Sequence, residues 1–182
     1  MPQISDTVRA DEYHAAMSNI SPPHLGTLAA PVAARLIARK ETIAVAESSA
    51  GGLISAALLA IPGASAYFLG GGVIYTQAAR RALLRVPDDA VKGARSSTEA
   101  YAQIKARTIR ELLGTTWGLS ETGATGPKGN RYGDAAGHAC IAVAGPVERV
   151  ITVETGSPDR EANMWCFTRE ALALLEACVG GR

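Results

Sequence analysis

Two glycine-rich segments carry the hydroxyl groups of this sequence that are best placed to do chemistry. The first, AESSAGG at residues 46–52, places Ser48 and Ser49 between a β-branched run and an alanine- and leucine-rich run. The second, ETGATGPKGN at residues 121–130, contains Thr122 and three glycines. A serine at a strand-to-helix turn is either a nucleophile or the cap of the following helix, and the pattern alone leaves both open.

The glycines of these segments suit them to a negatively charged group. Gly51 and Gly52 leave backbone N–H groups accessible at a predicted helix start, where the helix dipole also favours an anion. Gly123 and Gly126 have the same effect in the second segment. Such loops fit a phosphate, a carboxylate or a developing oxyanion. Composition alone favours the plainer interpretation, in which the glycines only make tight turns.

Several standard catalytic signatures are absent from the sequence. Neither segment matches GxSxG or GxGxxG, and the chain contains no SxxK and no GxxxxGK[ST]. The three cysteines, Cys140, Cys166 and Cys178, are far apart and include no CxxC pair. This spacing argues against a disulfide framework and against a thiolate zinc site. We expect neither a metal nor a cofactor.

Composition excludes several classes of protein. Of the 182 residues, 47% are hydrophobic and 19% charged, which is typical of a globular chain. The net charge is +1 and no basic face is concentrated, so we expect no nucleic-acid partner. The short basic stretch Arg80, Arg81 and Arg85 is interpreted as a solvated helix face. Without an apolar run of ~20 residues or a signal peptide, we predict a cytoplasmic protein with no membrane partner.

The elements that must position these segments alternate along the chain. Residues 1–24 are predicted to be a flexible tail, and residues 25–182 a single domain. The pattern predicts an α/β sandwich with a mixed sheet, whose sites form at the carboxyl ends of strands. Helices are predicted at 25–40, 51–61, 77–85, 97–113 and 159–178, and strands at 42–46, 73–75, 117–120, 139–144 and 147–155. Residues 63–72 are predicted as a glycine-rich turn, and 121–138 as a long loop.

Five segments occur in one order that resembles the C-terminal domain of the competence/damage-inducible CinA family. They are AESSAGG, GASAYFLGGGVIYTQAARRALL, ARSS, TGATGP and GSPDREA, and the similarity spans roughly residues 25–178. The family includes the nicotinamide mononucleotide amidohydrolases (deamidases). The resemblance implies a three-layer α/β/α sandwich. It also implies a stand-alone form, without the family's molybdenum-cofactor-binding-like N-terminal domain.

The family pattern AES, YSNEAK, TGIAGP and GDR implies roles for matching residues. Ser48 matches the serine nucleophile, and Glu47 the glutamate before it. Tyr75 matches the tyrosine of the second segment, where it either contacts a ligand or packs in the core. The remaining matches to the family's substrate site are Thr122, Gly123, Gly126 and Arg160, with Arg160 as a candidate phosphate ligand.

One departure from the family pattern concerns the base. The family's lysine is replaced by Arg80. An arginine keeps its proton at ordinary pH, so Arg80 cannot take the proton of Ser48, although it can hold an anion. His138 and Asp134, in the altered second loop, are candidates for a replacement base. In the plainer interpretation, His138 begins a strand and satisfies nearby backbone groups.

A second group of departures surrounds the serine. Ser49 stands where the family has a cysteine, and it is interpreted as the helix cap. Met164 stands where the family has a second arginine. The loop after TGATGP continues as KGNRYGDAAGH rather than in the family's usual way. We therefore expect a divergent branch of the family.

The resemblance predicts an amidohydrolase that acts on a small-molecule nucleotide and takes part in NAD salvage. Ser48 would attack the carboxamide carbon, backbone N–H groups near Gly51, Gly52 or the second loop would hold the oxyanion, and Arg80 and Arg160 would hold phosphate. Catalytic roles are thus assigned to Ser48, Tyr75 and Arg80, and substrate binding to Glu47, Ser49, Gly51, Gly52, Thr122, Gly123, Gly126 and Arg160. A homo-oligomer is expected. The alternatives are a nucleotide-binding module that does not hydrolyse its ligand, and a purely structural or interaction protein.

Overall fold

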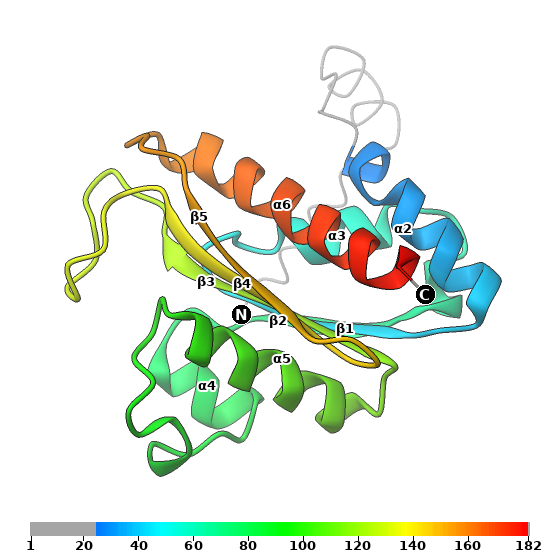
Figure 1. The fold of residues 1–182 in the computed structure, drawn as a ribbon, viewed down its shortest axis with the longest axis horizontal. Helices are drawn as coiled ribbons and strands as arrows, with labels where there is room; N and C mark the ends of the chain where they lie inside the picture. The colour runs from blue at the N-terminus through cyan, green and yellow to red at the C-terminus, as the bar shows by residue number, and fades with distance from the viewer. Residues whose placement is uncertain (1–24, 182) are drawn as a thin grey trace, which may run out of the picture.

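Five strands form one mixed sheet in the computed structural model, which describes residues 25–181 (Figure 1). The strand order is β2-β1-β3-β4-β5. Strands β2, β1 and β3 run parallel to one another, whereas β4 pairs antiparallel with both β3 and β5. The strands are β1 (Ile43–Glu47), β2 (Phe68–Val73), β3 (Trp117–Ala124), β4 (His138–Ala144) and β5 (Arg149–Glu154). The predicted α/β sandwich with a mixed sheet is confirmed.

Helices cover both faces of the sheet, which gives the three layers seen in Figure 1. One face carries α2 (Leu25–Arg39), α3 (Leu53–Leu59) and α6 (Arg160–Gly180). The opposite face carries α4 (Gln77–Leu83) and α5 (Glu99–Leu113). Two short 3₁₀ turns, η1 (Ala64–Ala66) and η2 (Asp89–Val91), lie in the connections. None of the helices in residues 25–181 is long and apolar enough to cross a membrane.

The two faces of the sheet are packed with side chains of different size. The α2, α3 and α6 face holds large residues such as Trp117, Leu119 and Phe167, all fully buried. The α5 face is lined by alanines, so the helix lies close to the strands. A Cβ on Gly118 would lie 2.0 Å from the carbonyl oxygen of Ala106, which requires glycine at this crossing. This close approach brings polar residues of α5 against the end of β3.

Strand pairing overturns two predicted element boundaries, and the strand predicted at residues 73–75 already ends at Val73. Gly70, Gly71 and Gly72 lie inside β2 rather than in a turn, because the parallel ladder to β1 takes up their backbone groups. Strand β3 continues four residues beyond the predicted end, and its pairing with β4 extends to Ala124 opposite His138. Pairing between strands that are distant in sequence outweighs local propensity here. The strand therefore carries the start of the second glycine-rich segment.

Most helix positions agree with the predictions, and short polar side chains cap α5 and α6. Asp159 caps α6, and its carboxylate accepts a hydrogen bond from the Ala162 N–H at 3.1 Å. Thr98 caps α5 by accepting from the Tyr101 N–H at 3.3 Å. The predicted tail at residues 1–24 lies outside the described residues, so the tail and the single-domain boundary remain predictions.

Candidate active site

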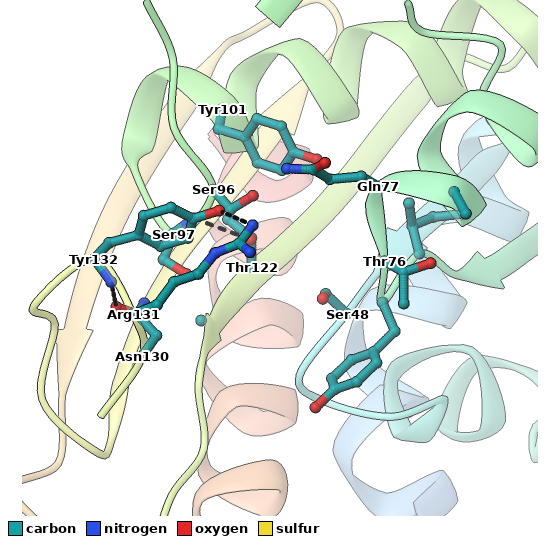
Figure 2. Close-up of a pocket in the computed structure, with 14 residues that line it drawn as sticks. Ser48, Thr76, Gln77, Ser96, Ser97, Tyr101, Thr122, Asn130, Arg131 and Tyr132 are labelled. Carbon is teal, nitrogen blue, oxygen red and sulfur yellow. Dashed lines mark hydrogen bonds between the residues drawn. The ribbon is translucent and has the colours of Figure 1, made fainter. Parts of the chain in front are cut away.

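A pocket of about 620 Å³ opens at the carboxyl ends of β1 and β3 (Figure 2). This volume is within the range of small-molecule sites, and the position is one where α/β sheets bind ligands. Five hydroxyl side chains other than tyrosine line it: Ser48, Thr76, Ser96, Ser97 and Thr122. The aromatic lining residues are Tyr75, Tyr101 and Tyr132. The pocket thus offers hydrogen-bonding groups and ring faces.

Ser48 begins the serine turn (residues 48–52), which joins β1 to α3. Its backbone N–H donates to the Glu121 carboxylate at 2.9 Å, and the Ala50 N–H donates to the same oxygen at 2.8 Å. The Ser48 side chain is half-buried and is turned toward the open space that Thr122 also faces (Figure 2). The structure therefore anchors this serine by its backbone and leaves the hydroxyl in the pocket.

Ser49 does not cap helix α3, which corrects the sequence prediction. Its hydroxyl donates to the second carboxylate oxygen of Glu121, and the cap position is taken by Gly52 in a left-handed conformation with φ of 102°. A capping serine accepts a hydrogen bond from a helix N–H, whereas the Ser49 hydroxyl is turned toward a carboxylate and donates to it. The two adjacent serines thus differ in role, because one faces the pocket and the other is used internally.

Glu47 accepts hydrogen bonds from the backbone N–H groups at the start of α3. Its fully buried carboxylate accepts from the N–H groups of Gly52, Ile54 and Ser55 at 2.9, 3.1 and 3.0 Å, and from the Ser55 hydroxyl at 2.6 Å. The Gly51 N–H donates to the Ser48 carbonyl at 3.1 Å. The N–H groups of Gly51 and Gly52 are therefore bonded within the chain. Burial raises the pKa of Glu47, although its bonds to Ser55 oppose that rise.

Arg80 lies outside the lining of the Ser48 pocket. Its side chain is 2% exposed, so the predicted solvated helix face is wrong for this residue, although it holds for Arg81. The guanidinium is ion-paired with Asp88 and donates to the Pro87 carbonyl at 2.7 Å. Its Nε has no hydrogen-bond partner among the described residues. It lines a neighbouring cavity of about 860 Å³.

Arg160 and Tyr75 meet at a third cavity, of about 380 Å³, that adjoins the Ser48 pocket through Tyr75 and Gly123. The Arg160 guanidinium donates to the Gly126 carbonyl at 2.7 Å and to the Tyr75 hydroxyl at 3.4 Å. The structure thus brings Ser48, Tyr75 and Gly123 to one pocket and places Arg160 and Gly126 beside it. Met164 lies against Gly51, where an added Cβ would be 2.6 Å from its methyl group.

His138 and Asp134 are engaged in structural contacts. His138 begins β4, and its ring nitrogens contact the Glu154 carboxylate and, at 3.0 Å, the Ser97 carbonyl. Burial opposes its charged form, but the bonds to Glu154 and Ser97 outweigh burial and raise the pKa of His138. Asp134 forms a two-pronged ion pair with Arg95 at 2.6 and 2.7 Å. This geometry agrees with the plainer interpretation of His138.

The altered loop forms one wall of the pocket. Two guanidinium groups lie near the centre of the Tyr132 ring, that of Arg131 at 5.0 Å and that of Arg95 at 5.5 Å. The Arg131 guanidinium also donates to the Tyr132 hydroxyl at 2.8 Å, and this bond lowers the pKa of Tyr132 (Figure 2). The attraction between these two cations and the ring favours its orientation. The loop thus offers both charge and aromatic surface to a ligand.

The sequence predictions missed two charged residues, Lys105 and Glu121. Glu121 is fully buried within β3, and Lys105, only 1% exposed, donates from Nζ to the Glu121 carbonyl at 2.8 Å. Burial lowers the pKa of Lys105 to about 8, although Glu121 and Glu47 oppose that shift. The sequence contained a signal for the burial of Lys105, because this lysine shares one face of its helix with Ala102, Ala106 and Ile109. A lysine in such a stripe is rarely solvated.

Residues 25–181 contain no group of three or more His, Cys, Asp or Glu side chains placed to hold a metal ion. Fold and site together define an α/β protein with a serine-bearing pocket at the carboxyl ends of the central strands of a mixed sheet. Residues 25–179 match the CinA C-terminal domain family. The chain therefore belongs to the CinA C-terminal domain family, as its motifs indicate.

Relatives of known sequence and structure agree with this assignment. A CinA-like protein of Salinibacter ruber is 36% identical over 92% of this chain, and one of Gloeobacter violaceus is 38% identical over 82%. The chain spans only 40% and 35% of those two relatives. A CinA superfamily protein of Klebsiella pneumoniae superposes with a TM-score of 0.81 at 27% identity, covering 88% of this chain and all of its own. A competence damage-inducible protein A of the same species gives 0.80 at 28%, covering 87% of this chain and 98% of its own.

Proposed function

We propose that this domain hydrolyses the carboxamide of a small nucleotide, as the family resemblance to nicotinamide mononucleotide deamidases implies. One observation carries the proposal. Ser48 is held by its backbone to a buried carboxylate, while its hydroxyl lies in a pocket of about 620 Å³ at the carboxyl edge of the sheet. A nucleophile needs this combination of a fixed backbone and an accessible oxygen.

The proposed reaction has two steps, acylation of Ser48 and hydrolysis of the resulting ester. The Ser48 oxygen attacks the carboxamide carbon, the C–N bond breaks, and the serine proton leaves with the amine as ammonia. Water then cleaves the serine ester, which releases the carboxylic acid and restores the hydroxyl. The Thr122 hydroxyl accepts from the Ser97 N–H at 3.3 Å, so its own proton is available to an oxyanion. We assign Thr122 this role, because the Gly51 and Gly52 N–H groups are bonded elsewhere.

The pocket walls support a nucleotide as the substrate. The rings of Tyr75, Tyr101 and Tyr132 can stack on a base, and Arg160 and Lys128 in the adjoining cavity can hold a phosphate. Arg80 is already paired with Asp88, so we assign phosphate binding to Arg160 rather than to Arg80. A role in NAD salvage and assembly into a homo-oligomer belong to the same proposal.

Ammonia release from nicotinamide mononucleotide tests the proposal. We expect release by the native chain and a loss of at least about a hundredfold in Ser48→Ala, because the nucleophile is removed. Ser65→Ala, at an exposed serine on η1, is the matched control and should keep full activity. If calorimetry shows binding of the nucleotide while no ammonia appears, the non-hydrolytic alternative is correct instead.

A further inference from the structure

Three buried charges lie beneath the serine turn. Two are the carboxylates of Glu47 and Glu121, here called the carboxylate cradle, and the third is the ammonium of Lys105. They come from three different elements, β1, β3 and α5. Two anions buried side by side destabilise a fold unless a cation offsets them. Lys105 donates to the backbone carbonyl of Glu121, and its charge interacts electrostatically with both carboxylates of the cradle.

A single residue connects Lys105 to the nucleophile. Lys105 donates to the Glu121 carbonyl at 2.8 Å, and the Glu121 carboxylate accepts from Ser48 N–H, Ala50 N–H and the Ser49 hydroxyl. Lys105 does not line the Ser48 pocket, although Tyr101, one turn earlier on α5, does. The hydrogen-bonded path from Lys105 to the Ser48 backbone therefore runs through Glu121.

We propose that Lys105 is a positioning residue for Ser48, whose buried ammonium offsets the charge of Glu121 so that the Glu121 carboxylate holds the serine turn. The catalytic part of this inference rests on the proposed function. The structural part, that the charge of Lys105 governs the turn, does not.

The charge of Lys105 can be switched by pH. The groups that face it are Glu121 from β3, Glu47 from β1 and the Tyr101 ring of its own helix, 6.0 Å away. Because burial lowers the pKa of Lys105 to about 8, the ammonium is present below that pH and lost above it. A positioning role therefore predicts that the rate falls as pH rises through about 8. A role as general base predicts the opposite, since the neutral amine would be the active form.

Backbone NMR tests the structural part without any activity. The amide protons of Ser48 and Ala50 report their bonds to Glu121, so in the native chain we expect both signals to shift with a midpoint near pH 8. In Lys105→Met this step should be absent. Lys92→Met, at an exposed lysine, is the matched control and should retain it. Flat signals through this range in the native chain would overturn the proposal.

Kinetics test the catalytic part. We expect kcat for ammonia release to fall above about pH 8 in the native chain. In Lys105→Met, kcat should be about ten- to a hundredfold lower, and its decrease above pH 8 should be absent. A native kcat that rises through pH 8 contradicts a positioning role. If no ammonia is released, the proposed function fails while the NMR titration still decides the role of Lys105. Should Lys105→Met fail to fold, Lys105→Met/Glu121→Gln removes both charges, and its amide signals should likewise lack the step.

Discussion

The serine turn (residues 48–52) and the altered loop (residues 128–138) are held in opposite ways. The serine turn is anchored from below by fully buried carboxylates, Glu47 and Glu121. The altered loop is held at the surface, by the ion pair between Arg95 and Asp134 and by the cations around Tyr132. Buried charged hydrogen bonds are costly to break, whereas exposed ion pairs contribute little to stability. We therefore expect the serine turn, which carries the proposed nucleophile Ser48, to be the more firmly held of the two, and the altered loop to adjust more easily to a ligand.

Removing Glu121 should lower the stability of the protein more than any other change proposed for the serine turn or the altered loop. In Glu121→Ala, three donors of the serine turn lose their acceptor and Lys105 loses the charge that offsets its own. We expect a loss of about 3–5 kcal/mol in the free energy of unfolding, measured by urea denaturation. Glu148→Ala, which removes an exposed ion pair with Arg107, should cost less than about 1 kcal/mol. Equal losses in the two variants would show that the cradle is no more important than a surface pair.

Glu47→Gln should have an intermediate effect. The amide keeps one acceptor oxygen but loses the other, so we expect a loss of about 1–3 kcal/mol near neutral pH. Because burial raises the pKa of Glu47 above its ordinary 4.5, the proton-linked part of its contribution to stability is full below 4.5 and is lost as pH rises through the folded pKa, while its hydrogen bonds to the α3 N–H groups remain. The difference between the native and variant unfolding curves should therefore shrink with rising pH in that window. A difference that grows with pH would mean that the folded pKa lies below 4.5.

Asp134→Asn should have the smallest effect on stability and act mainly on the ligand. The ion pair is partly exposed, at 42% for Arg95, so we expect a loss of at most about 1 kcal/mol. The Arg95 bond lowers the pKa of Asp134 from 3.8 to about 2, so this contribution is present above 3.8 and lost as pH falls toward 2. Because the loop wall loosens, KM for the nucleotide should rise about threefold with kcat unchanged. A matched fall in kcat would place the loop in the chemistry instead.

Prediction from the sequence succeeded where local signals decide the structure. Thr98 and Asp159 begin their helices because short polar side chains cap the free N–H groups there, and a single sequence shows such signals. It failed at Gly70–Gly72, where the ladder to β1 makes a strand out of residues with low strand propensity. The same limit applies to Ser49, whose hydroxyl bonds to a residue 72 positions away.

By itself, the sequence determined the alternation of strands and helices, the two glycine-rich segments and, through the order of its motifs, the family. Only the tertiary structure decided which polar groups face the pocket. Glu121 reaches the Ser48 N–H across 73 residues, and Lys105 joins it from a helix on the other side of the sheet. The physical reason is that every buried polar group must find a partner, and packing alone determines which partners are in reach.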